Sequence, residues 1–224
     1  MDIAKAARGL VVVLAAGVLT ACTSAGAVSG PIPTPALDAA LAPTKSRQVA
    51  VVAGGCFWGI QSVYQHVRGV VEATSGYAGG EAATAHYEMV GGGDTGHAES
   101  VEVVYDPSQI TYGQLLRVFF SVAHDPTQRN RQGPDYGPQY RSAIFTGDAE
   151  QDRIARAYIA QLDDAKVFAS AIATVVSPLT RFYAAEDYHQ NYADLHPNDM
   201  YIRINDAPKV ENLQRVLPEL FVKR

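Results

Sequence analysis

Hydrophobic and polar residues alternate along this chain with two different periods. Beyond Cys56, apolar side chains recur every three to four residues as far as Val67, which predicts an amphipathic helix. Residues 98–105 alternate with a period of two, which predicts a strand with one buried face. Similar patterns predict strands at 48–53, 70–77, 141–146 and 171–177, and helices that start after Thr111 and after Asp148. A last helix, expected on the surface, is predicted from Asn205 to Leu217.

The order of these elements indicates the fold class. Up to Thr146 the order is strand, helix, strand, strand, helix, strand, which is typical of a ferredoxin-like, two-layer α+β sandwich. The later helix and strand would be C-terminal additions to this βαββαβ core. A doubly wound parallel sheet is disfavoured, because residues 70–105 contain two predicted strands with no helical pattern between them. The aromatic stretch from Phe182 to Tyr192 is compatible with a terminal helix that packs on the sheet.

Two long segments between these elements lack a regular pattern. Residues 78–97 are rich in glycine, and residues 124–140 combine proline, glycine and polar side chains. Loops of this length in a compact domain often carry function. Tyrosines from both segments are therefore candidates for a functional site.

The first 46 residues differ in composition from the rest. A basic start and a short apolar run are typical of a signal peptide over residues 1–21. The run ends in Leu-Thr-Ala-Cys, which resembles the bacterial lipobox, so we expect Cys22 to become the lipidated first residue of the mature chain. The alternative is an ordinary signal peptide cleaved near Ala21 or Ala27. Residues 22–46 are rich in Ala, Ser, Gly, Thr and Pro, which predicts a flexible tether.

Export would change the charge of the chain only slightly. Removal of residues 1–21 takes away two cations and one anion, Lys5, Arg8 and Asp2, so the net charge of −5 becomes −6. Without a basic stripe, nucleic acid is not an expected partner. A lipid on Cys22 would supply the membrane attachment, which predicts an exported lipoprotein that faces the periplasm. The remaining residues 47–224 suffice for one compact domain, expected to be a monomer.

Cysteine usage draws attention to one thiol. The chain has two cysteines, and with Cys22 acylated no intramolecular disulfide is possible. Cys56 follows two glycines that permit a sharp turn and stands where the first predicted helix begins. The positive end of a helix favours the thiolate, so Cys56 is a candidate nucleophile. A buried, inert cysteine is the alternative.

Glu99 is the candidate partner of this thiol. The period of two places it on the apolar face of strand 98–105. A carboxyl group that is buried there would have a raised pKa and would hold a proton near neutral pH. In the alternative interpretation, Glu99 lies beyond the buried part of the strand and is solvated.

Six short motifs follow one another between residues 49 and 195. They read Gly54-Gly55-Cys56-Phe57-Trp58-Gly59, Gly96-His97-Ala98-Glu99, Val104-Tyr105-Asp106-Pro107, His124-Asp125-Pro126, Gln139-Tyr140-Arg141-Ser142 and Tyr188-His189-Gln190. In this order they closely resemble the motifs of the A-type peptide methionine sulfoxide reductases. The resemblance implies reduction of methionine S-sulfoxide, free or in proteins, by attack of the Cys56 thiolate, and hence repair of oxidised proteins.

The resemblance also implies a role for each site residue. Glu99 would act as the acid that protonates the sulfoxide oxygen, because sulfoxide sulfur is otherwise a poor electrophile. Tyr87 and Tyr140 would donate hydrogen bonds to that oxygen. Phe57 and Trp58 would form an aromatic pocket for the S-methyl group of the substrate. Asp135 would help to order the site, and His189 would support it.

Regeneration of the enzyme departs from many members of this family. Oxygen transfer leaves Cys56 as a sulfenic acid, which must be reduced before the next turnover. Many relatives use further cysteines near the C-terminus, but residues 191–224 contain none. We therefore expect an external thiol, thioredoxin-like or other, as reductant, and no bound cofactor.

Other functions are compatible with parts of the sequence. A cysteine hydrolase would pair Cys56 with His124 or His189. A thioredoxin-like disulfide oxidoreductase is disfavoured, because Cys-Phe-Trp-Gly lacks a second thiol. A lipid-anchored binding module would use the aromatic residues without chemistry. No metal site is predicted, since the histidines and the aspartate of the glycine-rich loop are best interpreted as solvated: His86, Asp94 and His97.

Overall fold

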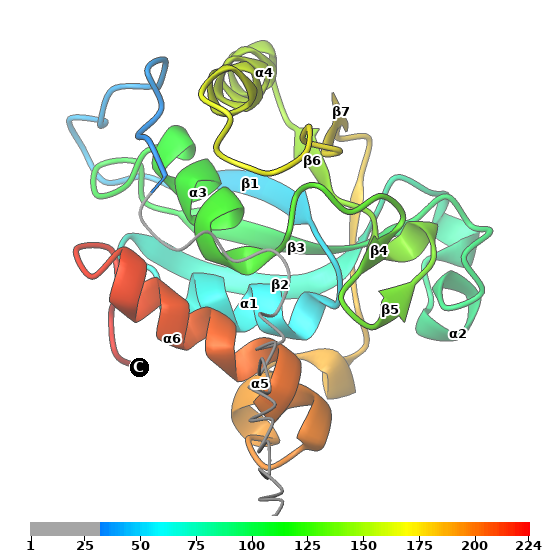
Figure 1. The fold of residues 1–224 in the computed structure, drawn as a ribbon. Coiled ribbons are helices and arrows are strands. Elements are labelled where there is room, and N and C mark those ends of the chain that lie inside the picture. Colours follow the sequence, from blue (N-terminus) through cyan, green and yellow to red (C-terminus); the bar gives the residue numbers. More distant parts are fainter. Residues whose placement is uncertain (1–31) are drawn as a thin grey trace, which may run out of the picture.

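In a computed structural model, residues 32–224 are described (Figure 1). The predicted signal peptide, Cys22 and the start of the predicted tether lie outside the described residues. Within residues 32–224, no helix is both long enough and apolar enough to cross a bilayer.

A mixed six-stranded sheet forms the centre of the domain. Its strand order is β7-β6-β1-β3-β2-β8, and all neighbours are antiparallel except β6 and β7, which are parallel. A separate two-stranded hairpin lies in the predicted loop at 124–140. The strands are β1 (Gln48–Ala53), β2 (Val70–Ala78), β3 (Ala98–Tyr105), β4 (Arg131–Gln132), β5 (Asp135–Tyr136), β6 (Ala143–Thr146), β7 (Val175–Pro178) and β8 (Phe182–Ala184).

The larger helices cover one face of this sheet. They are α1 (Phe57–Gln65), α3 (Tyr112–Val118), α4 (Ala149–Asp164) and α6 (Ala207–Val216), and shorter helices are α2 (Tyr87–Val90) and α5 (Tyr192–Leu195). Single turns or distorted turns are η1 (Ala82–Thr84), η2 (Phe119–Ala123), η3 (Pro138–Tyr140), η4 (Asp187–His189) and η5 (Ile202–Asp206). Figure 1 shows α1 and α6 side by side, and α4 above α3 at the top of the view. The predicted α+β class is therefore confirmed.

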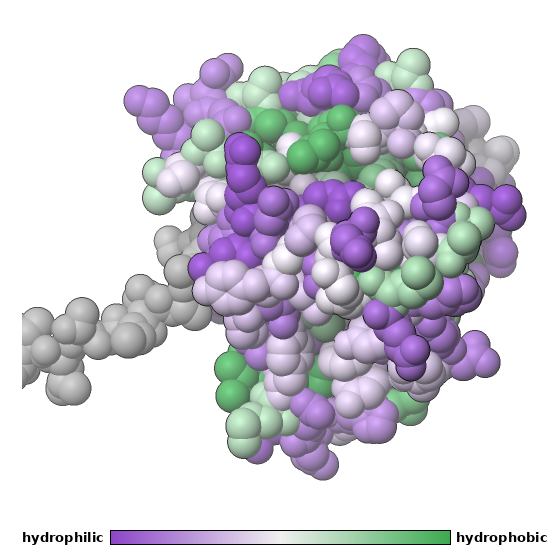
Figure 2. Space-filling view, turned by 90° about the vertical axis from the view of Figure 1, so that its right-hand side faces the viewer, coloured by the Kyte–Doolittle hydropathy of each residue, from purple (hydrophilic) through white to green (hydrophobic). Residues whose placement is uncertain are grey.

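The main hydrophobic core lies between the sheet and these helices. It unites the apolar stripes of α1, α3, α4 and α6 with one face of β1 and β3. The opposite face of the sheet carries a second, smaller cluster built mostly from alanines. β1 serves both cores, because Val52 faces the helices and Val51 faces the smaller cluster. On the surface shown in Figure 2, hydrophobic groups occur as separate patches among hydrophilic residues.

Local signals in the sequence located several element boundaries correctly. Thr111 and Gln114 form the predicted capping box at the start of α3, each side chain bonding the other's backbone N–H. Asp148 caps α4 by accepting a hydrogen bond from the Gln151 N–H at 2.8 Å. β3 occupies the predicted residues 98–105.

The C-terminal part differs from the prediction. The aromatic stretch that was compatible with a helix begins as the edge strand β8, paired with β2. The predicted strand at 171–177 is shorter and shifted, as β7. The helix near Asn205 was expected on the surface, yet Leu213 and Leu217 are fully buried. These differences share a cause, since pairing with distant strands and packing against α1 are not encoded in local periodicity.

The structure corrects the predicted flexible tether over residues 32–46. Ile32 is buried in the main core, and the backbone oxygen of Pro33 accepts a hydrogen bond from the Tyr158 hydroxyl at 2.6 Å. The Asp38 carboxylate accepts hydrogen bonds from the Thr111 hydroxyl and, at 2.8 Å, from the Gly113 N–H at the start of α3. A composition of small residues and prolines predicted a solvated chain, but one apolar side chain and one carboxylate suffice to hold it on the domain.

Candidate active site

Cys56 stands at the junction of β1 and α1. The chain leaves β1 at Ala53, turns through Gly54 and Gly55, and enters α1 with Cys56 as its N-cap. Gly55 has φ +98°, and a Cβ at Gly54 would lie 2.8 Å from the His124 ring, so both glycines are required. The predicted thiol at a helix N-terminus is thus observed.

Glu99 lies beside this helix start. Its Oε2 accepts a hydrogen bond from the Phe57 N–H at 3.1 Å, one of the donors that a first helical turn leaves free. Glu99 is only 3% exposed, which excludes the solvated alternative. Burial raises the pKa of Glu99 to about 8, the Phe57 hydrogen bond lowers it, and the nearby Asp135 and Asp206 raise it further. Glu99 therefore holds a proton at neutral pH, as its position on the strand predicted.

The resting state of Cys56 differs from the expectation of a helix-stabilised thiolate. Burial raises the pKa of Cys56 well above its usual value, and the neighbouring carboxyl groups of Glu99 and Asp206 raise it further. The Trp58 N–H and the Lys209 ammonium act in the opposite direction. Loss of hydration outweighs the partial charge of the helix N-terminus, so Cys56 rests as a thiol.

An aromatic cluster adjoins the thiol on the side of α1. The ring of Trp58 stacks on Tyr192 with centroids 3.9 Å apart, and its Nε1–H donates to His189 Nδ1 at 3.2 Å. Phe57 and Tyr87 pack against the same His189 ring at centroid distances of 5.1 and 4.4 Å. His189 therefore contacts three of the predicted substrate-binding residues, Phe57, Trp58 and Tyr87.

Tyr87 and Tyr140 come from the two long loops that the sequence singled out. Tyr87 opens α2 in the first loop, and Tyr140 ends η3 in the second. Burial raises the pKa of both hydroxyls, and Glu99 and Cys56, when ionised, raise it further. Both tyrosines are therefore neutral hydrogen-bond donors at physiological pH, in the electrostatic neighbourhood of Glu99 and Cys56.

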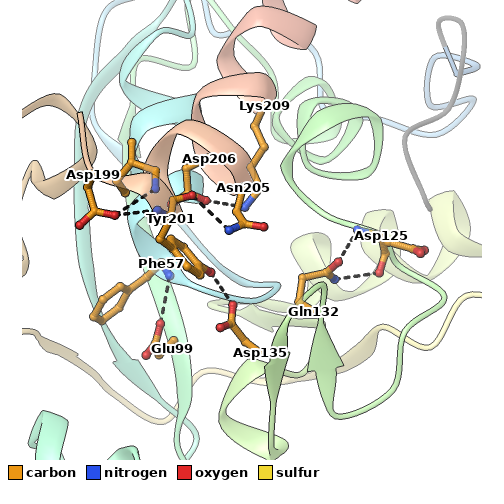
Figure 3. A network of polar contacts seen from close by, with 11 residues as sticks. Phe57, Glu99, Asp125, Gln132, Asp135, Asp199, Tyr201, Asn205, Asp206 and Lys209 are labelled. Carbon is orange, nitrogen blue, oxygen red and sulfur yellow. Dashed lines mark hydrogen bonds and ion pairs between the residues drawn. The ribbon is translucent and has the colours of Figure 1, made fainter. Parts of the chain in front are cut away.

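A cavity of about 250 Å³ opens next to Cys56. Asp135, on β5, lines it and accepts a hydrogen bond from the Tyr201 hydroxyl (Figure 3). The Tyr201 ring meets the edge of Trp58 with centroids 6.1 Å apart. The cavity and the aromatic cluster are therefore two sides of one site, with Cys56 between them.

A family model for peptide methionine sulfoxide reductase matches residues 48–219, most of the chain. The chain belongs to the peptide methionine sulfoxide reductases. It is 55% identical over 177 residues to the peptide methionine sulfoxide reductase MsrA 2 of Mesorhizobium japonicum, covering 79% of this chain and 91% of the relative. It is 50% identical over 186 residues to the MsrA 2 of Synechocystis, covering 82% and 87%.

Solved structures agree with this assignment. The reduced form of Mxr1 from Saccharomyces cerevisiae has a TM-score of 0.61 at 36% identity, covering 72% of this chain and 91% of that one. Methionine sulfoxide reductase A of Corynebacterium diphtheriae has a TM-score of 0.59 at 34% identity, covering 77% and 88%. The protein is thus an oxidoreductase that reduces methionine sulfoxide and repairs oxidised proteins.

The geometry of the reductase also argues against a cysteine–histidine hydrolase. His124 lines the cavity, but its Nδ1 contacts the Phe119 carbonyl at 3.2 Å and its Nε2 contacts the Ser142 hydroxyl at 2.7 Å. Burial lowers the pKa of His124 to about 3. His189 has its Nδ1 engaged by Trp58. Neither imidazole is arranged to accept a proton from Cys56.

The part of the reductase that the structure describes offers no candidate metal site. Among residues 32–224, no three histidine, cysteine or acidic side chains converge as metal ligands. One part of the earlier interpretation is wrong, because His97 is buried and its Nε2 contacts the Glu81 carbonyl at 3.0 Å. His86 and Asp94 are exposed, as expected of loop residues.

Sequence reasoning missed three residues that the structure brings to the site. They are Tyr201 just before η5, Asp206 at the end of η5 and Lys209 on α6, about 150 residues after Cys56 along the chain. Tyr201 and Lys209 line the cavity, and Asp206 is 1% exposed. The only hint in the sequence was a helix start in which a proline stands between an aspartate and a lysine, a pattern common on protein surfaces.

Proposed function

We propose that this reductase acts on the S-epimer of methionine sulfoxide, free or in proteins, through direct attack by the sulfur of Cys56. The observation that carries the proposal is the buried, protonated Glu99 bonded to the first N–H of the helix that Cys56 caps. A sulfoxide becomes electrophilic only when its oxygen is protonated or strongly hydrogen-bonded. The site supplies both an acid and a nucleophile at one helix terminus.

The reaction of Cys56 with the sulfoxide takes up no net proton from solvent. Glu99 donates its proton to the substrate oxygen while Cys56 attacks the substrate sulfur, and the thiol proton of Cys56 returns to Glu99. The oxygen then moves to the sulfur of Cys56, which becomes a sulfenic acid, and methionine leaves. The substrate sulfur gains two electrons and the cysteine sulfur loses two. A resting thiol beside a neutral carboxyl is therefore the competent starting state.

The surrounding side chains would orient the substrate. Tyr87 and Tyr140 would donate hydrogen bonds to the oxygen, where negative charge is largest. The rings of Phe57 and Trp58 would hold the S-methyl group, which offers no polar handle. Asp135 would order the site through its hydrogen bond with the Tyr201 hydroxyl, and His189 would hold the aromatic rings in place.

Regeneration would use thiols from another molecule, thioredoxin-like or other. One external thiol would condense with the Cys56 sulfenic acid, releasing water and forming a mixed disulfide, and a second thiol would release Cys56 by exchange. Support comes from the sequence, in which residues 191–224 contain no cysteine that could resolve the intermediate. The cycle needs no bound cofactor, because the two thiols supply both electrons.

The decisive experiment is a single turnover without reductant. Purified protein is mixed with each epimer of methionine sulfoxide, and methionine is quantified together with the sulfenic acid at Cys56. We expect one methionine per Cys56 from the S-epimer alone, and none from the Cys56→Ser variant. A binding module that uses no chemistry at Cys56 would instead keep its full activity in Cys56→Ser. Absence of methionine from the S-epimer, or formation of a disulfide within the chain, would overturn the mechanism.

We further propose a ferredoxin-like core and a lipid anchor. The order β6-β1-β3-β2, with all pairs antiparallel and α1 and α3 as crossovers, supports the βαββαβ arrangement. The lipobox sequence supports export as a periplasm-facing lipoprotein attached at Cys22, and we propose that the domain is a monomer. Because residues 32–46 pack on the domain, at most about 35 Å of chain remains between the anchor and the domain. Mass spectrometry of the membrane fraction, with Cys22→Ala as control, tests the anchor.

A further inference from the structure

Asp206 and Lys209 form an ion pair in the interior of the site. The Lys209 ammonium donates to Asp206 Oδ1 at 2.9 Å, and the side chains of Asp206 and Lys209 are 0% and 17% exposed (Figure 3). Lys209 lines the same cavity as Cys56. The second oxygen of Asp206, Oδ2, is buried and has no hydrogen-bond partner among the described residues. A buried, incompletely bonded ion pair destabilises a fold, which calls for a functional explanation.

Helix α1 is shaped to admit this pair. Gly59 follows Cys56 by three residues, close to one helical turn. A Cβ at Gly59 would lie 2.1 Å from Asp206 Oδ1 and 2.8 Å from the Lys209 ammonium. Glycine within a helix is unfavourable compared with alanine, so its presence here is explained by the close approach of the two charges. The glycine that ends the Cys-Phe-Trp-Gly motif thus makes room for a charged pair beside the nucleophile.

The charges around Cys56 are otherwise acidic. Glu99 and Asp206 act on the thiol, Asp125 and Asp135 line its cavity, and the described lining of the cavity contains a single cationic side chain, Lys209. Tyrosines and one neutral histidine complete the titratable surroundings. The groups that face the thiol or its cavity are Glu99 on β3, Asp135 on β5, Asp206 on η5, Tyr201 just before η5, Lys209 on α6, Tyr87 on α2, Tyr140 on η3, and His124 and Asp125 after η2.

We propose that the Asp206–Lys209 pair sets the charge state of Cys56. The two side chains are positioning residues, and they act on the Cys56 sulfur in opposite directions. Lys209 stabilises negative charge on the sulfur as attack begins. Asp206 opposes that charge between turnovers and keeps the lone thiol protonated, which protects it from oxidants that react with thiolates. The roles during attack and between turnovers rest on the proposed function, whereas the effect of the pair on the ionisation of the Cys56 thiol does not.

The electrostatic effects on the three groups support this assignment. Asp206 raises the pKa of Cys56 and Lys209 lowers it. Burial lowers the pKa of Lys209, but Asp206, Cys56 and Asp135 raise it, and the balance keeps the ammonium charged. Removing either partner should therefore move the pKa of Cys56, in opposite directions. An opposite charge within about 4–6 Å moves a pKa by about one unit or more.

Alkylation of Cys56 tests the proposal without any sulfoxide. The full chain is treated with iodoacetamide at pH 8, and the modified Cys56 peptide is quantified over time by mass spectrometry. Well below its pKa the rate follows the thiolate fraction, so a shift of one unit changes it about tenfold. We expect Lys209→Met to slow alkylation about tenfold and Asp206→Asn to accelerate it about tenfold. Lys209→Arg should restore a rate near that of the wild type.

Controls separate this effect from a loss of structure. Lys223→Met removes the same charge from an exposed position near the end of the chain and should leave the rate unchanged. A purely structural role would move Lys209→Met and Asp206→Asn in the same direction, and that result, or no change in either, overturns the proposal. If Lys209→Met does not fold, absence of acceleration in Asp206→Asn overturns it alone. Because no substrate is present, the outcome is independent of whether the proposed reaction is correct.

Discussion

Replacement of Glu99 by glutamine should remove most of the activity and yet stabilise the protein. Glutamine has nearly the same shape and can still accept the Phe57 N–H hydrogen bond that now holds Oε2 at 3.1 Å. It has no acidic proton to donate to the sulfoxide oxygen. General acid catalysis contributes about 10²- to 10⁴-fold, so we expect the single-turnover rate to fall by that factor, about 3–5 kcal/mol in the barrier.

The stability change has the opposite sign because the folded protein raises the pKa of Glu99 from 4.5 to about 8. The contribution of this group to stability is complete below pH 4.5 and is lost as the pH rises toward 8, since the unfolded chain ionises there and the folded chain does not. At pH 7 the loss is roughly 3 kcal/mol. Glu99→Gln removes this loss and should unfold at a higher urea concentration at pH 7 than the wild type.

Two assays at a series of pH values decide this prediction. The wild-type single-turnover rate should decline above about pH 8 as Glu99 loses its proton, and the residual rate of Glu99→Gln should lack that decline. Urea unfolding should show the stability gain at pH 7 and none at pH 4. Glu72→Gln, on an exposed position of β2, is the matched control and should change neither quantity. If Glu99→Gln retained full activity, or gained no stability at pH 7, the buried acid would not have the role assigned to it.

Two further predictions concern packing around the site and at the N-terminal segment. Gly59→Ala should destabilise the fold by about 1–3 kcal/mol, despite the better helix propensity of alanine, because the alanine Cβ would overlap the Asp206 carboxylate. Thermal unfolding measures the change in stability. A variant more stable than the wild type would contradict the close approach of Asp206 to Gly59. Asp38→Ala should lower the free energy of unfolding in urea by about 1–2 kcal/mol, because the hydrogen bonds to Thr111 and Gly113 are lost. The single-turnover activity should not change. An unaltered urea midpoint would show that the contacts of Asp38 do not stabilise the packing of residues 32–46 on the domain.

Much of the catalytic centre was determined by short stretches of sequence. Two glycines before Cys56 encode the turn that places it at the start of α1, and the alternation in residues 98–105 puts Glu99 on a buried face. The caps at Thr111 and Asp148 mark the starts of two helices. These features depend on steric limits and hydrogen bonds within a few residues, so they can be recognised without the rest of the molecule.

The tertiary structure decided the charge and the surroundings of the thiol. Helix position alone predicted a thiolate, but burial together with Glu99 and Asp206 leaves Cys56 protonated. The composition of residues 32–46 predicted a solvated tether, although Ile32 enters the core. The sequence predicted that Lys209 lies on a surface helix, but α6 packs on α1 and places Lys209 in an ion pair with Asp206. Desolvation and charge pairing act between segments that are distant in sequence, so only the folded chain determines them.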